Sequence, residues 1–260
     1  MSVKIIKSIN EWQEIYAANI KDKKSLGFVA TMGALHIGHI SLIQRSLKEN
    51  DLTICSIFIN PTQFNNPDDL SNYPTTIEGD IKLLESVGCN FLFLPTQEII
   101  YPDGYNYILT EKTLSSRFCG AHRPGHFDGV LTVVLKLLNI IQCDNAYFGE
   151  KDWQQYKLIK GMARALFLNC NIIPCTLIRE DDGLAFSSRN KNLSPKNREI
   201  APYLYKIISS DTTIESMKKE LTALGFAVDY IEEMDNRLLA AASLGKVRLI
   251  DNVKKGIKNV

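Results

Sequence analysis

The stretch LGFVATMGALHIGH, from Leu26 to His39, contains a change of pattern from which the rest of the sequence can be interpreted. Residues 26–31 form an apolar run typical of a buried strand, and residues 40–49 have the apolar spacing of a helix. The segment between them therefore lies at the carboxyl end of a strand and opens a helix. In an open parallel sheet ligands bind at that edge, and a helix N-terminus attracts phosphate. The stretch therefore predicts a site for nucleotide phosphate.

The same alternation of strand and helix patterns continues on the C-terminal side of this stretch. Further candidate strands are 52–60, 91–95, 146–149 and 172–178, and further candidate helices are 78–87, 129–141 and 153–167. This order predicts βαβ units and a parallel sheet covered on both faces. We therefore expect an α/β fold, with a Rossmann-like domain over residues 1–176.

The pattern changes after Arg179. A loop containing Gly and Ser spans residues 181–192, helical stretches follow, and residues 226–231 and 247–250 are candidate short strands. This order predicts a small α+β C-terminal domain over residues 177–260.

Composition narrows the class of protein. The chain has 260 residues with 45% hydrophobic content, and its 30 Lys and Arg against 29 Asp and Glu give no broad positive field for nucleic acid or anionic membrane. No apolar run approaches the ~20 residues that span a bilayer. Residues 1–10 lack the features of a signal peptide. We therefore expect a cytoplasmic protein that binds neither nucleic acid nor membrane.

Two histidines at the predicted helix start, His36 and His39, can donate hydrogen bonds to charge developing on an α-phosphate. Gly33 and Gly38 would let the backbone approach such a ligand. In an arbitrary sequence an H-x-x-H pair is more often a metal pair or a chance feature of a helix start. The strand–turn–helix context favours the phosphate interpretation.

Several motifs resemble one enzyme family. Residues 36–39 spell the HIGH signature of a nucleotidyl-transfer superfamily, and residues 30–39 resemble the P-T-M-G-A-L-H-x-G-H of pantothenate synthetases, the pantoate–β-alanine ligases. The segment SIFINPTQF at 56–64 resembles their S-I-F-V-N-P-x-Q-F. Further matches follow in the same order at 72–76, 123–130, 148–155, 179–190 and 248–252. The chain is thereby identified, by resemblance, as a member of this family.

The resemblance implies a ligase of pantothenate and coenzyme A biosynthesis. Such enzymes join pantoate to β-alanine with ATP, through an enzyme-bound pantoyl-adenylate, and release pyrophosphate and then AMP. It also implies Mg²⁺ and a homodimer. Two alternatives are a nucleotidylyltransferase of the same superfamily acting on a phosphorylated substrate, and a nucleotide sensor without catalysis. The nucleotidylyltransferase would need extra Lys or Arg where residues 60–64 and Gln155 offer amides.

The resemblance implies an ATP site built from three segments. Its residues are Met32, Gly33, Ala34, Leu35, His36, Ile37, Gly38 and His39; Gly149, Glu150, Lys151 and Asp152; and Ile178, Phe186, Ser187, Ser188 and Arg189. Four of these are predicted to be catalytic. His39 is the proton donor, His36 its partner at the phosphate, Lys151 follows the phosphate charge, and Arg189 lies on a mobile loop that closes over pyrophosphate.

For the substrates, the resemblance implies that Gln63 and Gln155 hold pantoate and that Gln63 also lies near β-alanine. Asn60 is a further predicted substrate contact, and Arg123 and His126 are predicted near the pantoate pocket. Neutral amides can bind a carboxylate without neutralising the nucleophile. Asp80 resembles an acidic position near Mg²⁺ and the phosphates, and is the predicted metal ligand. A four-histidine zinc site, with His122, has no support from the family.

The sequence departs from the family pattern at Ala30 in place of Pro, Thr75 in place of Arg and Phe186 in place of Met. None of these removes a predicted phosphate contact. Residues 234–242 are also compressed relative to the family, so we expect the small C-terminal sheet to lack part of a strand.

Overall fold

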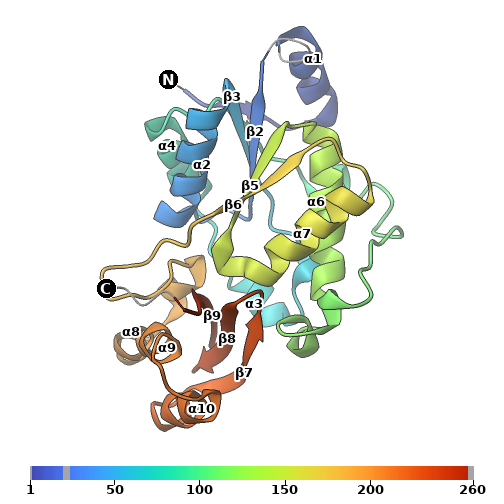
Figure 1. The fold of residues 1–260 in the computed structure, drawn as a ribbon. Helices are drawn as coiled ribbons and strands as arrows, with labels where there is room; N and C mark the ends of the chain where they lie inside the picture. The colour runs from blue at the N-terminus through green and yellow to red at the C-terminus, as the bar shows by residue number, and fades with distance from the viewer. Residues whose placement is uncertain (1, 20–23, 257–260) are drawn as a thin grey trace. The chain divides into compact units, whose positions relative to one another are not determined.

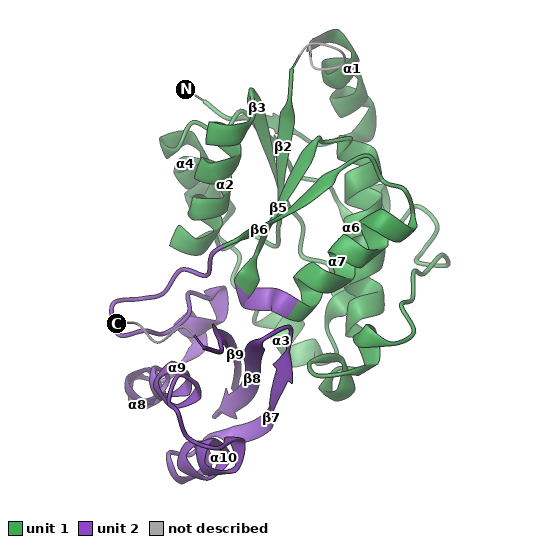
Figure 2. Ribbon diagram, in the orientation of Figure 1, with its two compact units in different colours: residues 1–150, 154–175 green, residues 151–153, 176–260 purple. Residues whose placement is uncertain are grey.

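The computed structural model describes residues 2–19 and 24–256 (Figure 1). These divide into two compact units, one of residues 1–150 and 154–175 and the other of residues 151–153 and 176–260 (Figure 2). We describe each unit separately. Within the described residues, no helix combines the length and the apolar character that crossing a membrane requires.

The larger unit is built on a six-stranded sheet in the order β1-β4-β3-β2-β5-β6, with every neighbouring pair parallel. The strands are β1 (Lys4–Ile6), β2 (Leu26–Thr31), β3 (Leu52–Ile57), β4 (Phe91–Phe93), β5 (Asn145–Gly149) and β6 (Asn171–Cys175). The helices are α1 (Ile9–Asn19), α2 (Ile37–Glu49), α3 (Pro67–Ser71), α4 (Ile77–Ser86), α5 (Gln97–Ile100), α6 (His126–Ile141) and α7 (Trp153–Ala165). Figure 1 shows α2 and α4 on one face and α1, α6 and α7 on the other. The predicted Rossmann-like α/β fold is confirmed.

The central strands are apolar along nearly their whole length because helices cover both faces of the sheet. Five of the six residues of β2 and five of the six of β3 are buried. The register pairs Thr31 with Ile57, so these two strands end side by side. The chain runs from β2 to β3 on one side, whereas β5 pairs with β2 on the other. The order of strands therefore reverses beside β2, which is where ligands bind in open α/β sheets.

The smaller unit contains a three-stranded antiparallel sheet in the order β7-β8-β9. Its elements are α8 (Pro195–Ile200), α9 (Tyr203–Ile208), α10 (Ile214–Ala223), β7 (Ala227–Met234), β8 (Arg237–Leu244) and β9 (Val247–Lys254). Buried side chains of the sheet, such as Ile231, Ala240 and Leu249, pack with Leu204 and Leu221 of the helices.

The expectation of an incomplete strand in this sheet is wrong. All three strands have eight residues. The turn between β7 and β8 is short, and its residues Asp235 and Asn236 both have positive φ, at 51° and 58°. A two-residue turn of that kind joins antiparallel strands directly. Strand β8 was not predicted because its Ala-rich segment, RLLAAASL, has weak β-propensity and is held as a strand by burial.

Candidate active site

The two signature histidines lie together at the N-terminus of α2. His36 is the N-cap residue, and its Nδ1 accepts a hydrogen bond from the Gly38 N–H at 3.1 Å. The helix therefore begins at Ile37, three residues before the predicted start. Because Nδ1 is an acceptor here, the neutral His36 ring carries its proton on Nε2. The His36 and His39 ring centroids are 4.1 Å apart. The structure thus brings together the two imidazoles predicted to meet a phosphate.

The loop before α2 binds a carboxylate of the protein itself. The N–H groups of Ala34 and Leu35 donate to the Asp80 carboxylate at 2.8 Å each, and the Gly33 N–H donates to Thr31 Oγ1 at 3.2 Å. Gly33 has φ of +82°, and a Cβ on it would lie 3.1 Å from Asp80 Oδ2. Gly33 therefore lets the backbone approach Asp80, whereas the sequence had suggested that it lets the backbone approach the ligand. We expect phosphate to meet the first turn of α2 and the imidazoles instead.

Gln63 lies beside the signature loop. It ends the 3₁₀ turn η1 (Pro61–Gln63), which follows β3. Its Nε2 donates to Met32 Sδ at 3.0 Å, and its Oε1 accepts from Asn60 Nδ2 at 3.1 Å. The structure therefore joins Met32, predicted for the ATP site, to the amide predicted to hold pantoate. This contact follows from the register of β2 and β3, which ends both strands at one level.

Asn60 holds the Gln63 side chain in place through a hydrogen bond. Its side chain is 1% exposed, and its Nδ2 also donates to the Gly129 carbonyl at 3.2 Å. Its Oδ1 accepts from Tyr101 OH at 2.8 Å and from Thr62 Oγ1 at 3.0 Å. Burial raises the pKa of Tyr101 to about 12, so the phenol remains a donor. With both its N–H groups and its oxygen engaged, Asn60 positions Gln63, and this geometry gives no support to its prediction as a substrate contact.

Arg123 and His126 hold the backbone of Gln63. His126 Nδ1 donates to the Gln63 carbonyl at 2.7 Å, and Arg123 Nη2 donates to the same oxygen at 3.2 Å. Arg123 Nη1 lies 3.1 Å from His126 Nε2, which therefore acts as the acceptor. The two residues predicted near the pantoate pocket thus converge on Gln63 through its main chain.

Gly129 is a packing position next to Gln63 that the sequence did not reveal. It lies in α6, where a Cβ would come within 2.5 Å of the Thr62 carbonyl oxygen and 2.8 Å of the Gln63 nitrogen. Helix α6 therefore packs directly against η1 only because residue 129 has no side chain. A glycine inside a helix was the available signal.

Two adjacent glutamines at the start of α7 have different environments. Gln154 is buried, donates to the carbonyls of Leu114 and Arg117 at 2.8 and 2.7 Å, and accepts from the Cys119 N–H at 3.0 Å. It anchors the loop over residues 114–119. Gln155 is half-buried and lies about 100° further round the helix. Its predicted role in holding pantoate stays a prediction.

In the smaller unit, Lys151 is supported by the last strand. Asn252 Nδ2 donates to the Lys151 carbonyl at 3.1 Å, and Arg237 Nη1 donates to Asn252 Oδ1 at 2.7 Å. The Arg237 guanidinium also lies 4.0 Å from the centre of the Trp153 ring. Segment 151–153, which includes Asp152, is thus held by β8 and β9 of the smaller unit. Gly149 and Glu150, predicted for the same ATP segment, belong to the larger unit.

The predicted phosphate-binding loop is a folded turn in this unit. The Phe186 N–H donates to the Ile178 carbonyl at 3.2 Å, which closes the segment between them. Ser187 caps the 3₁₀ helix η5 (Ser188–Asn192) by accepting from the Arg189 N–H at 3.3 Å. Ser188 is buried. Phosphate binding by this loop stays a prediction.

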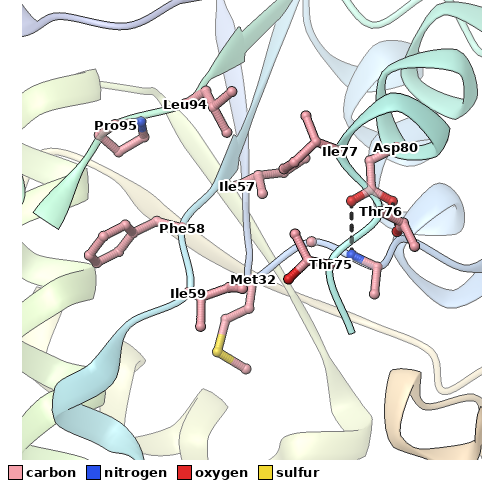
Figure 3. Close-up of a pocket in the computed structure, with 12 residues that line it drawn as sticks. Met32, Ile57, Phe58, Ile59, Thr75, Thr76, Ile77, Asp80, Leu94 and Pro95 are labelled. Carbon is pink, nitrogen blue, oxygen red and sulfur yellow. Dashed lines mark hydrogen bonds between the residues drawn. The ribbon is translucent and has the colours of Figure 1, made fainter. Parts of the chain in front are cut away.

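A cavity of about 190 Å³ opens at the ends of β2, β3 and β4 in the larger unit (Figure 3). Its wall is mainly apolar and includes Met32, Ile57, Phe58, Ile77 and Leu94, with polar groups from Thr75, Thr76 and Asp80. Figure 3 shows the Asp80 carboxylate bonded to the backbone of the signature loop. Thr75, one of the departures from the family pattern, therefore lines a cavity next to Met32.

The residues present do not fit the predicted metal site. The Asp80 carboxylate accepts from two backbone N–H groups and from Thr76 Oγ1, the last at 3.0 Å. Among the residues that the structure describes, no three His, Cys, Asp or Glu side chains gather in a way that could hold a metal ion. The four-histidine zinc arrangement is therefore not formed either.

Comparison with known proteins assigns the family. The sequence model of the pantoate-beta-alanine ligase family matches residues 4–254. The chain belongs to this family. It is 48% identical over 250 residues to the pantothenate synthetase of Legionella pneumophila (strain Corby), covering 96% of this chain and 99% of that protein. The pantothenate synthetase of Bdellovibrio bacteriovorus is also 48% identical, over 96% of this chain and 98% of its own.

Solved structures agree with this assignment. The pantoate-beta-alanine ligase of Francisella tularensis, crystallised with beta-gamma ATP and beta-alanine, is 45% identical with a TM-score of 0.94, covering 98% of each chain. The pantothenate synthetase of Thermus thermophilus is 34% identical with a TM-score of 0.89, covering 97% of this chain and 99% of that one. The prediction of an ATP-dependent pantoate–β-alanine ligase is confirmed at the level of the family.

Proposed function

We propose that this chain uses ATP to join pantoate to β-alanine through a pantoyl-adenylate. A carboxylate oxygen of pantoate attacks the α-phosphorus, and the bond to pyrophosphate breaks. The β-alanine amine then attacks the acyl carbon, loses a proton, and displaces AMP. The observation that supports this proposal is the contact between Gln63 and Met32, because Gln63 is proposed to hold pantoate and Met32 belongs to the signature segment proposed to bind ATP.

The chemistry of Gln63 suits a carboxylate nucleophile. Its Oε1 accepts from Asn60, so Nε2 is the end that can donate to a ligand. In this structure Nε2 donates to a thioether sulfur, which is a weak acceptor. A carboxylate or hydroxyl oxygen is a better acceptor and would replace it. A neutral donor then orients pantoate without the charge of a guanidinium, which would weaken the attacking oxygen.

His36 and His39 are proposed to stabilise charge on the α-phosphate. His36 offers its Nε2 proton because Nδ1 is used in capping α2. Lys151 and Arg189 of the smaller unit are proposed to follow the phosphate charge and the departing pyrophosphate. ATP and the two small acids are thus the proposed ligands. A cytoplasmic homodimer completes the proposal and rests on the family resemblance.

The order of events gives a direct test of this function. Enzyme supplied with ATP, Mg²⁺ and pantoate but no β-alanine is expected to release a burst of pyrophosphate of about one per site. The adenylate forms once and stays bound until the amine arrives. Rapid-quench measurement of pyrophosphate checks this, and Arg189→Ala is expected to shrink the burst. A nucleotidylyltransferase or a nucleotide sensor would show no pantoate-dependent burst. Pyrophosphate released only on addition of β-alanine would exclude the adenylate.

Removing the Gln63 amide is expected to affect pantoate selectively. In Gln63→Ala we expect the KM for pantoate to rise roughly tenfold, the scale of one lost hydrogen bond to a charged group, with the KM for ATP nearly unchanged. Steady-state kinetics with each substrate varied in turn measures both. Gln97→Ala removes an exposed glutamine in α5 and serves as the matched control. An equal rise in both KM values would assign Gln63 to the nucleotide or to the fold.

A further inference from the structure

The β2–α2 loop has a backbone shape that is unfavourable without support. Gly33 and Ala34 both have positive φ, at 82° and 48°, and Ala34 carries a side chain in that left-handed region. Such conformations persist only where the surroundings hold them in place. The loop leads directly into His36, the cap of α2, so its shape sets where the signature imidazoles lie.

Asp80 provides that support from a separate helix. It lies in the first turn of α4 and is 1% exposed. Oδ2 accepts from the Ala34 N–H and Oδ1 from the Leu35 N–H, both at 2.8 Å. Successive backbone N–H groups that converge in this way form an anion-binding concavity. Here the anion is a side chain of the protein, 46 and 45 residues away along the chain.

The remaining contacts of Asp80 keep its carboxylate in this position. Thr76, the N-cap of α4, donates through Oγ1 to Asp80 Oδ1 at 3.0 Å, and the Asp80 N–H donates to the Thr76 carbonyl at 2.8 Å. Three of the roughly four acceptor positions of the carboxylate are thus directed at protein donors. Both oxygens face the loop and Thr76, which is not the arrangement of a metal ligand open to a nucleotide.

We infer that Asp80 is a positioning residue that sets the conformation of the signature loop, and through it the placement of His36 and His39, without ligating a metal. This inference rests on the proposed function, because it takes that loop to be the phosphate site. Asp80 touches neither substrate nor reacting atoms in this assignment. A carboxylate suits this position because each of its two oxygens accepts from a different N–H group, whereas an amide has only one acceptor oxygen.

The test replaces the carboxylate with its isosteric amide. In Asp80→Asn one N–H group of the loop must face an NH₂ group, so we expect kcat for pantoate-dependent ATP–pyrophosphate exchange to fall at least ~10-fold. The Mg²⁺ concentration for half-maximal exchange is expected to stay unchanged, whereas loss of a metal-site residue would raise it ~10-fold or more. Glu78→Gln, which removes an exposed carboxylate from the same turn of α4, is the matched control.

A second readout does not depend on activity. Hydrogen exchange at the Ala34 and Leu35 amides, followed by NMR, is expected to accelerate at least ~10-fold in Asp80→Asn and to stay at the wild-type rate in Glu78→Gln. If Asp80→Asn does not fold, Thr76→Val removes only the supporting hydroxyl and is expected to shift both readouts in the same direction.

The outcomes distinguish a failure of the positioning role of Asp80 from a failure of the proposed function. If folded Asp80→Asn kept the wild-type kcat and the wild-type rates of hydrogen exchange at Ala34 and Leu35, the positioning role would be overturned. A raised Mg²⁺ requirement with unchanged amide protection would assign Asp80 to the metal and also overturn it. If the wild-type enzyme showed no pantoate-dependent ATP–pyrophosphate exchange, the proposed function would be refuted instead. Hydrogen exchange at Ala34 and Leu35 would still decide whether Asp80 holds the loop.

Discussion

Replacing His39 with alanine is expected to reduce the rate of adenylation by at least ~100-fold, the scale of losing one transition-state hydrogen-bond donor. His39 lies in the first turn of α2 with its ring centroid 4.1 Å from that of His36. It is half-buried and is not among the buried residues that form the core. The fold is therefore expected to remain, and the loss should appear in kcat.

Pantoate-dependent ATP–pyrophosphate exchange measures this effect, and thermal unfolding checks that the variant is folded. His122→Ala is the matched control, because His122 is exposed and lies outside the signature segment. Exchange close to the wild-type rate in a folded His39→Ala enzyme would remove His39 from the chemistry.

Gly129→Ala is expected to combine a loss of stability with a defect in pantoate use. The added methyl group would lie 2.5 Å from the Thr62 carbonyl oxygen and 2.8 Å from the Gln63 nitrogen, and both are backbone atoms that cannot rotate away. Relieving this overlap must move η1 or α6. We expect the free energy of unfolding to fall by ~1–3 kcal/mol, as for other overpacked sites, and the KM for pantoate to rise as Gln63 is displaced.

Urea unfolding and steady-state kinetics test the two parts of this prediction. Gly161→Ala is an informative control, because Gly161 lies inside α7 and a Cβ there meets nothing within 4 Å. That substitution is expected to be neutral or to stabilise by up to ~1 kcal/mol, since alanine favours a helix over glycine. Equal effects of the two substitutions on stability and on the KM for pantoate would show that neither depends on the packing of α6 against η1.

The sequence by itself predicted the features that depend on short segments. Alternating apolar runs and helical spacing predicted the α/β sheet, because each pattern spans only one strand or one helix. It also placed the signature motif at a strand–helix junction, and the structure shows Thr31 ending β2 and Ile37 starting α2. The short β1 and the helix α1 beside it were not predicted, since a strand of three residues carries almost no periodic signal.

Only the tertiary structure decided what individual polar residues do. Asn60, Asp80 and Gln155 were predicted to contact a metal or a substrate because their positions resemble those of the family's motifs. Folding gives Asn60 and Asp80 protein partners up to 69 residues away in sequence, and it buries Gln154 while leaving Gln155 half-buried. The physical reason is that a buried polar group must satisfy its hydrogen bonds, and the available partners depend on strand register and helix packing, which a local pattern does not contain.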